Sequence, residues 1–493
     1  MKKAFYILLL IFLIPEESLA DFSTNALIGY LTGIPALSEL PYGNKSGYEY
    51  PAELAQDITQ YIKFTGSRQE VFRNFLGEHK NIDHGLFSIG LNYPLIENTA
   101  GTYISFTDNR SSISWPFSKN RIRTVDSYKA GTICVSGYTF ARENVRVGAT
   151  IGKQIKSDRN RLLHIVEFSG AVSQRLNGSM RYFSLPYEWG VDINYKNITK
   201  TLPSHFQYTG FEGNITYSLT EHMHITFSGE KGDIDTPKKF QVIPDNHTQM
   251  WNGSRDRWKI RILNSPVADI VLDASYGEDT LSGELNLCYD GDQYMQGTLD
   301  GDTRRFGFGV QLEDVKRYIP VIHYDRVSTE LALSRGIADS WPFTPKQIEI
   351  IGDKTWTFSG TGSIVSDSGT FSWKLSSLSR MVFSYVRAHF DYRLRITTRD
   401  HLSTNPLDMI YGKSRIETDR TRYYDFAHVY YGRNYIFGRL SLEFGISQFI
   451  PVHHSRKKIP GKAPAPPSFP ELKIKKPENF GGFSFEVNGK WLF

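Results

Sequence analysis

Apolar and polar residues alternate with a period of two along much of this chain, and this alternation limits the possible folds more than any other feature. The stretch "FEGNITYSL" places Phe211, Ile215 and Leu219 on one parity and Glu212 and Asn214 on the other. Successive side chains of a strand point to opposite faces, so such a stretch predicts a strand with one apolar face. Comparable runs lie at 87–93, 145–152, 223–228, 258–263, 306–312, 356–364, 371–375, 386–396 and 440–446. The sequence therefore predicts an all-β fold.

The N-terminus has the pattern of a secretory signal peptide. "MKKAFYILLLIFLIPEESLA" contains two lysines, an apolar run from Ala4 to Ile14, and Ser18-Leu19-Ala20. The apolar run is shorter than the about 20 residues that cross a bilayer as a helix. We therefore expect residues 1–20 to be a signal peptide, cleaved near Ala20, and the protein to be exported.

Two architectures share the alternating pattern. A soluble β-sandwich or dry-cored barrel buries its apolar face, whereas a membrane barrel turns that face toward lipid and its polar face toward the lumen. Several runs reach the roughly 9–11 residues of a transmembrane strand. The polar parity is also rich in Gly, Ser, Thr, Asn and charged residues. The sequence thus favours a membrane barrel in which Phe87, Val147, Ile215 and Phe390 face lipid.

The alternation continues to the last residue of the chain. In "GGFSFEVNGKWLF", Phe485, Val487, Trp491 and Phe493 fall on one parity. This ending resembles the assembly signal of Gram-negative outer-membrane β-barrel proteins, with Phe485 where that signal usually has a tyrosine. The resemblance covers the last strand. It implies a place in the outer membrane, the barrel-assembly machinery as a partner, and surrounding lipid and lipopolysaccharide.

These patterns predict a single large antiparallel transmembrane β-barrel over residues 81–493. We expect about 18 strands, within a range of roughly 16 to 20, which is wide enough for an aqueous channel unless the lumen is plugged. Residues 451–480 are rich in Pro and Lys and cannot form a central strand, so they are predicted to be a long loop before the last strand.

The segment before the barrel, residues 21–80, has a helical pattern in two places. In "PAELAQDITQYI", Leu54 and Ile58 are spaced like one face of a helix, and "SRQEVFRNFL" begins with a capping box from Ser67 to Glu70. These features predict two short helices that plug the lumen or gate its periplasmic mouth. A loop packed against one end of the barrel is the alternative.

Two of the predicted strands carry basic rows on their polar parity. The residues are Arg257, Lys259 and Arg261 in one strand, and Arg387, Arg393 and Arg395 in the other. An Arg or Lys facing the middle of the bilayer costs about 2–4 kcal/mol, so both rows are expected to face the lumen. A basic lumen wall would favour anions or acidic saccharides. The alternative is that these arginines pair with carboxylates across the lumen.

The sequence contains no local signature of catalysis. There is no glycine-rich phosphate loop or zinc-ligand spacing, and no nucleophile stands out, so we expect no enzyme activity, no cofactor and no nucleic acid partner. The alternative is an outer-membrane hydrolase, whose catalytic residues would come from different strands and leave no local signature. His222 and His224 are weak metal candidates, because two imidazoles alone do not make a metal site. Whether Cys134 and Cys288, the two cysteines of the chain, form a bridge is left open.

The function that fits these features is a passive channel or export conduit of the outer membrane, with a partly basic lumen that favours small anionic solutes or polysaccharide. The first alternative is a non-conducting outer-membrane protein that acts in surface adhesion or exopolysaccharide assembly. The second alternative is a soluble secreted β-rich protein. The sequence does not predict the transported solute or the oligomeric state.

Overall fold

The computed structural model describes most of the chain after its first 49 residues, and the all-β prediction is confirmed. Nearly all the described residues lie in β-strands, and one short 3-10 helix, η2 (Glu53–Gln56), precedes them. The described residues are 50–56, 59–71, 81–96, 99–114, 122–142, 144–154, 162–195, 198–236, 242–243, 247–267, 270–289, 292–312, 320–339, 354–376, 378–400, 414–451 and 482–493.

The strands are long, and most of them have ten or more residues. In chain order they are β1 (Tyr61–Val71), β2 (Asn81–Ile96), β3 (Ala100–Ser114), β4 (Ile122–Arg142), β5 (Val145–Gln154), β6 (Leu162–Ser173), β7 (Leu176–Tyr195), β8 (Ile198–Ser218), β9 (Met223–Asp235), β10 (Val242–Ile243), β11 (His247–Val267), β12 (Ile270–Tyr289), β13 (Asp292–Leu312), β14 (Pro320–Asp339), β15 (Lys354–Ser376), β16 (Ser379–Asp400), β17 (Ser414–Phe437), β18 (Leu440–Pro451) and β19 (Gly482–Leu492).

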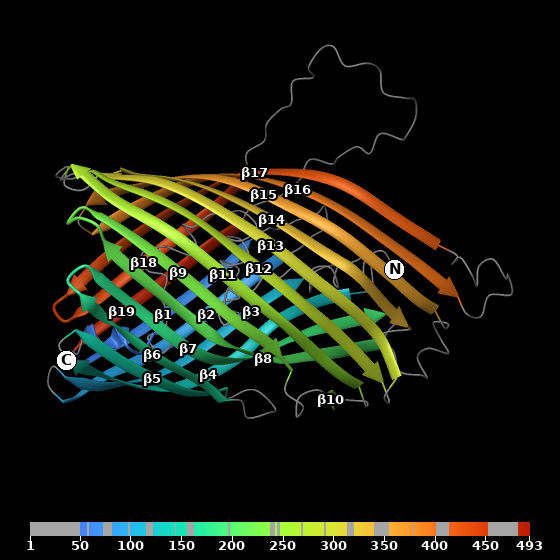
Figure 1. Cartoon of the computed structure of the whole chain (residues 1–493), viewed down its shortest axis with the longest axis horizontal. Helices are drawn as coiled ribbons and strands as arrows, with labels where there is room; N and C mark the ends of the chain where they lie inside the picture. The colour runs from blue at the N-terminus through green and yellow to red at the C-terminus, as the bar shows by residue number, and fades with distance from the viewer. Residues whose placement is uncertain are drawn as a thin grey trace, which may run out of the picture.

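All the strands belong to one antiparallel sheet, in which neighbours along the chain are mostly neighbours in space. β1 pairs with β2 on one side and with β19 on the other, so the first and last strands are adjacent. β9 pairs with β8 and with β11, and β4 also pairs with β7 beyond the shorter β5 and β6. Figure 1 shows the tilted strands and the curvature of the sheet.

The connections differ between the two ends of the sheet. At the end that carries the C-terminus, on the left of Figure 1, they are short: Gln174 and Arg175 join β6 to β7, and Gly438 and Arg439 join β17 to β18. Gly438 has a φ of 59°, a left-handed conformation that glycine adopts without steric cost. At the opposite end β14 and β15 are joined by residues 340–353, a much longer stretch.

One face of the sheet, which we call the outer face, exposes large apolar side chains. Phe87 is 48% exposed and Ile215 is 55% exposed, and Val147 is partly exposed, as the predicted sidedness requires. Other exposed outer-face residues are Ile104, Val135, Ile151, Phe168, Met180, Phe211, Phe227, Ile260, Tyr276, Phe306, Phe308, Tyr324, Phe371, Phe383, Phe444, Ile446, Phe485 and Trp491. The fourth residue named in that prediction, Phe390, has a side chain outside the described part.

The opposite face, which we call the inner face, carries hydrogen-bonded polar side chains. The hydroxyl oxygens of Ser136 and Thr150 lie 2.8 Å apart across β4 and β5, and both residues are buried. Other buried polar residues of this face are Thr65, Asn92, Ser105, Thr107, Thr132, Glu167, Glu230, Arg255, Thr303, Ser384, His428 and Ser447. Polar groups removed from bulk water need such partners, so the inner face is an organised polar wall.

Tyrosine rings lie over glycines on this inner wall. A Cβ atom on Gly101 would lie 2.3 Å from the hydroxyl oxygen of Tyr138, and one on Gly445 would lie 2.5 Å from that of Tyr430. Only glycine leaves room for such a ring at these positions, and this close approach explains glycine within a strand.

Part of the inner face is apolar. A buried cluster comprises Cys134, Leu163, Ile165, Phe183, Leu185, Tyr208 and Ile234. The rings of Phe183 and Tyr208 are 5.1 Å apart between their centroids. The prediction that the whole inner face is polar is therefore wrong in this region. In the "LLHIV" stretch of β6 both parities contain apolar residues, so alternation alone could not identify the buried face.

The two predicted N-terminal helices are also wrong over the described residues. Glu53–Gln56 forms a single 3-10 turn, and Ser67–Glu70, the proposed capping box, lies inside β1. β1 hydrogen-bonds to β2 and β19 along its length. With a helix in place of β1, the backbone groups on the facing edges of β2 and β19 would lack these partners. The sheet thus begins at Tyr61, earlier than the predicted barrel boundary at residue 81.

Two further sequence predictions concern parts of the chain that the structure describes little or not at all. The proposed signal peptide, residues 1–20, lies outside the described residues, as does the Pro- and Lys-rich loop at 451–480 except for Pro451. Among the helices in the described ranges, none has the length and apolar character needed to cross a membrane.

Candidate functional site

The inner face holds the N-terminal segment, which we define as residues 50–56, against β3, β4 and β5. The backbone N–H of Ala52 donates a hydrogen bond to Oε2 of Glu167 on β6, at 2.8 Å. Ala52 is 0% exposed and Glu167 is 1% exposed. A carboxylate in so dry a place needs hydrogen-bond donors, so this contact fixes the segment at one point of the wall.

Gly148 on β5 provides the space in which the segment lies. A Cβ atom at this position would be 2.3 Å from the carbonyl carbon of Pro51 and 2.3 Å from the backbone nitrogen of Ala52. Both are main-chain atoms, so no rotation of a side chain could relieve the overlap. Glycine at position 148 is therefore a condition for the segment to lie against β5.

Two apolar residues of the segment pack on tyrosines of the wall. Leu54 and Ala55 form a buried cluster with Tyr61, Tyr103 and Tyr138. These contacts bury the apolar side of the 3-10 turn. Together with the hydrogen bond from Ala52 they hold the N-terminal segment against the inner face.

A chain of hydrogen bonds continues toward β1. The Tyr138 hydroxyl donates to Oδ1 of Asn92 at 2.6 Å, and Nδ2 of Asn92 donates to the carbonyl oxygen of Thr59 at 2.8 Å. The backbone N–H of Phe493 donates to the carbonyl oxygen of Gln60 at 3.2 Å. Thr59 and Gln60, directly before β1, are thus hydrogen-bonded to the inner face and to the C-terminal residue, respectively.

Arg181 on β7 links the segment to the charged part of the wall. Its guanidinium carbon lies 4.3 Å from the ring centroid of Tyr50 and 5.3 Å from that of Phe183, in the range of cation–π contacts. Its Nη2 forms an ion pair with Oε2 of Glu212 on β8. One arginine therefore contacts both the segment and an inner-face carboxylate.

Ion pairs continue along the inner face from β9 to β12. Nη2 of Arg257 lies 2.5 Å from Oε2 of Glu230, and the Tyr208 hydroxyl donates to the other carboxylate oxygen of Glu230 at 2.5 Å. Nε of Arg255 donates to Oδ1 of Asp279 at 2.8 Å, and its Nη1 lies 3.9 Å from Glu230. The side chain of Arg255 is 1% exposed, so these carboxylates supply the negative charge that its burial requires.

The predicted basic row on β11 does lie on the inner face. Arg257, Lys259 and Arg261 share the parity of the buried Arg255, while Ile260 is exposed on the outer face. Arg261 forms an ion pair with Asp273, with Nη2 and Oδ2 2.6 Å apart. Two of the three residues are thus paired with carboxylates, as the alternative derived from the sequence expected, but their partners lie on the neighbouring strands β9 and β12 and not across the lumen.

The predicted row on β16 is placed differently. Val382 and Ser384 are buried on the inner face and Phe383 is exposed on the outer face. Strand alternation then puts the exposed Arg387 on the outer face, so its predicted place in the lumen is wrong.

The reason is the length of β16. It has 22 residues, about twice the roughly 9–11 that cross a bilayer, so its far part need not follow the lipid-facing pattern. Asp367, the Cα partner of Arg387, accepts a hydrogen bond from the hydroxyl of Tyr324, which makes this outer surface polar. Arg393 and Arg395 have the same parity as Arg387 in β16, and their side chains are outside the described part.

The residues of the predicted C-terminal assembly signal lie on the outer face. Phe485, Trp491 and Phe493 are 42%, 50% and 48% exposed, and Val487 is partly exposed. The rings of Trp491 and Phe493 stack with 5.3 Å between their centroids. The predicted apolar parity is therefore confirmed, and its role in assembly stays a prediction.

The described residues contain no group of three or more His, Cys, Asp or Glu side chains that could hold a metal ion. Nδ1 of His224 lies 2.9 Å from the hydroxyl oxygen of Ser218, and His222 is exposed in the turn before β9. Cys134 is a buried thiol of the inner face, not half of a disulfide.

Sequence reasoning missed the residues that organise the inner face. Glu167, Arg181, Glu230, Arg255 and Asp279 each lie in an otherwise apolar or mixed stretch and form no motif. Their partners come from different strands, and only the strand register brings them together. The one sequence feature that could have identified these residues is a charge on the polar parity of a predicted membrane strand.

No family model and no curated protein matches the chain. Among solved structures, the siderophore receptor PirA from Acinetobacter baumannii is 10% identical, with a TM-score of 0.37, over 89% of this chain and 81% of that chain. OccAB2 from Acinetobacter baumannii is 11% identical, with a TM-score of 0.37, over 88% and 98%.

A third match is OmpT, an outer membrane protein of Vibrio cholerae. It is 9% identical, with a TM-score of 0.31, over 56% of this chain and 88% of that chain. At these identities and TM-scores the matches assign neither a family nor a function to the chain.

Proposed function

We propose that the chain is an outer-membrane β-barrel that acts as a transport conduit. The observation that carries this proposal is the sidedness of the sheet: Phe87, Ile215 and Phe227 are exposed on the outer face, and ion pairs occupy the inner face. Burying apolar surface is worth roughly 25 cal/mol per Å², so an outer face of this kind is costly in water and favourable in lipid. The same observation opposes the soluble β-rich alternative.

The proposed barrel is closed and has about 18 strands, an even number as in bacterial single-chain barrels. The pairings of β1 with β19 and of β9 with β11 support closure, with the two-residue β10 beside the ring. β6, with 12 residues, is close to the roughly 9–11 residues that cross a bilayer. Short periplasmic turns are typical of such barrels, so the end with the C-terminus would face the periplasm.

The N-terminal segment is proposed to narrow the lumen. Its hydrogen bond to Glu167, its close approach to Gly148 and its packing on Tyr103 and Tyr138 support this role. In this proposal the lumen is narrowed by residues 50–56, which contact the inner face, and not by the two helices predicted from the sequence.

We also propose that the lumen favours small anions or acidic saccharides. Arg257 and Arg261 contribute little to this preference, because carboxylates offset their charges. Lys259 lies on the inner face, and so do Lys63 and Lys490, which are Cα partners across β1 and β19. These lysines would set the local potential of the lumen.

Conductance in planar bilayers tests two of these proposals, the transport conduit and its preference for anions. The wild-type protein is expected to form steady pores whose reversal potential in a salt gradient indicates anion preference. Exchange of Lys63 and Lys259 for Glu together is expected to weaken or reverse that preference, because the lumen loses two positive charges and gains two negative charges.

The matched control is Lys231→Glu, since the Lys231 side chain is 77% exposed on the outer face and should leave the reversal potential unchanged. An unchanged reversal potential in the double variant would contradict the proposed role of the lysines. Silence from protein that is folded in the bilayer, as shown by altered gel migration before heating, would contradict the conduit itself.

The membrane setting implies further partners. Phe485, Val487, Trp491 and Phe493 are proposed to present β19 to the barrel-assembly machinery of a Gram-negative bacterium. Their exposure at the end of the sheet supports this role. The finished barrel would contact phospholipid and lipopolysaccharide through its apolar outer face.

A further inference from the structure

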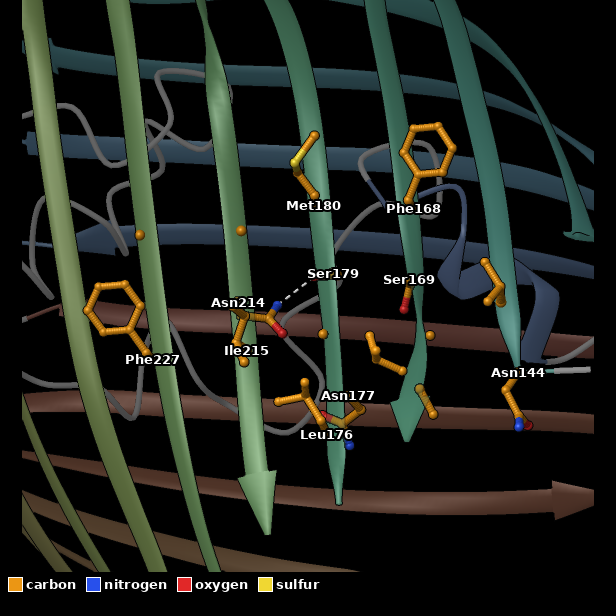
Figure 2. Close-up of a pocket in the computed structure, with 17 residues that line it drawn as sticks. Asn144, Phe168, Ser169, Leu176, Asn177, Ser179, Met180, Asn214, Ile215 and Phe227 are labelled. Carbon is orange, nitrogen blue, oxygen red and sulfur yellow. Dashed lines mark hydrogen bonds between the residues drawn. The ribbon is translucent and has the colours of Figure 1, made fainter. Parts of the chain in front are cut away.

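An apolar groove lies on the outer face where β6, β7, β8 and β9 run side by side. Its volume is about 1080 Å³, and Phe168, Met180, Ile215 and Phe227 are among its lining residues. Each of these four side chains is about half exposed. Figure 2 shows Phe168 and Met180 toward one end of the groove, and Leu176 toward the turn between β6 and β7.

The floor of the groove is backbone. Gly170 and Gly178 are Cα partners across β6 and β7, and Gly213 and Gly229 are Cα partners across β8 and β9. All four line the groove. Between the bulky side chains of Phe168, Met180, Ile215 and Phe227, these glycines leave a depression with apolar walls.

The chemistry of the groove suits a hydrocarbon chain. Its lining consists of apolar residues, glycines, serines and asparagines, and it contains no Asp, Glu, Lys or Arg. Without a charged group in the lining, an ionic ligand would lose its hydration with no compensation inside the groove.

One end of the groove does offer a charge. Arg175 is exposed in the turn between β6 and β7, directly before Leu176, which lines the groove. In the proposed membrane orientation this turn lies at the periplasmic surface of the bilayer, where lipid phosphates are found. A guanidinium can bind a phosphate through paired hydrogen bonds.

We propose that the groove binds one acyl chain of a phospholipid whose phosphate lies at Arg175. This inference rests on the proposed function, because the outer face must be in a bilayer. It goes further by naming a ligand class and a site on the wall, in place of general contact with lipid.

The test uses the full-length protein folded into vesicles of phosphatidylglycerol, released into mild detergent and weighed by native mass spectrometry. The wild-type barrel is expected to retain one phospholipid. Gly229→Leu should abolish this retention, because a Cβ there lies 3.7 Å from the nearest backbone atom, so the leucine fits the strand and fills the groove. Arg175→Gln should reduce retention, through loss of the contact with the phosphate.

Gly137→Leu is the matched control. Gly137 lies on the outer face of β4, outside the groove, and a Cβ there has no heavy atom within 4 Å. This variant should retain lipid like the wild type. Equal retention by Gly229→Leu and the wild type would overturn the proposal.

Two other outcomes would also decide the matter. Wild-type dimers or trimers that dissociate in Gly229→Leu would assign the groove to a second copy of the chain and overturn the lipid site. Insertion into vesicles without retained phospholipid would overturn the lipid site alone. Failure of the wild type to insert at all would overturn the proposed function as well.

Discussion

Gly148→Leu is expected to raise the single-channel conductance severalfold. Any side chain at position 148 overlaps the main chain of Pro51 and Ala52, which would lie 2.3 Å from its Cβ. The strand itself is held by β4 and β6 on both sides, so the N-terminal segment is the part that must move. Displacement would remove a constriction from the lumen, and planar-bilayer recordings measure the effect.

Glu167→Leu provides an independent route to the same state. It removes the acceptor of the Ala52 N–H, leaves the backbone of β6 intact and should also increase conductance. Gly137→Leu, on the outer face, serves as the control and should conduct like the wild type. Wild-type conductance in correctly folded Gly148→Leu and Glu167→Leu proteins would show that the segment does not restrict the lumen.

Arg255→Met is expected to lower the free energy of unfolding by about 3–5 kcal/mol, the usual cost of breaking a buried ion pair on one side. Arg255 is 1% exposed and contacts both Asp279 and Glu230. Methionine of similar length would leave one carboxylate without its bidentate partner in a dry environment. Urea titration of the barrel in lipid vesicles measures the change.

Arg304→Met is the matched comparison. The Arg304 side chain is 63% exposed on the outer face, with Nε 3.7 Å from Oε1 of Glu278. Exposed pairs of this kind contribute about 0–1 kcal/mol, so this variant should unfold nearly like the wild type. Equal losses of stability in the two variants would mean that the inner-face pairs are as well solvated as those on the surface.

The outward side of the sheet could be predicted from sequence where strands cross the proposed bilayer. In β8 and β19 one face exposes apolar side chains, which would meet lipid in the proposed membrane setting, and the other is the inner face. The two environments therefore alternate from one residue to the next. Ile215 and Trp491 are accordingly exposed where alternation placed them. The environment of each side chain depends only on which face of its own strand it occupies, so the alternation within one strand is enough to predict it.

The error at Arg387 arose because alternation gives two faces but not their environments. A membrane strand and its extension into water have the same period, and the polar face points inward in one and outward in the other. The basic stretch around Arg387 therefore could not be assigned to the lumen without knowing how far β16 continues beyond the apolar band.

The candidate site was not predictable because its contacts depend on register between strands. Arg257 is the direct Cα partner of Glu230 in β9, and it is also the direct Cα partner of Asp279 in β12. No spacing in one sequence gives those pairings. The proposed capping box at Ser67 failed for a related reason, since pairing with two neighbouring strands outweighed a local helical preference.

Accessibility of spin labels at two adjacent positions of β8 tests the central claim most directly. Ile215 lies on the outer face, and Asn214, on the inner face, donates a hydrogen bond to Ser179. Single nitroxide labels at these positions, in protein folded into vesicles, can be relaxed by oxygen, which concentrates in lipid, or by a water-soluble nickel chelate. We expect oxygen to dominate at position 215 and the nickel chelate at position 214. The reverse result, or nickel access at both positions, would contradict an apolar outer face in lipid around a polar lumen.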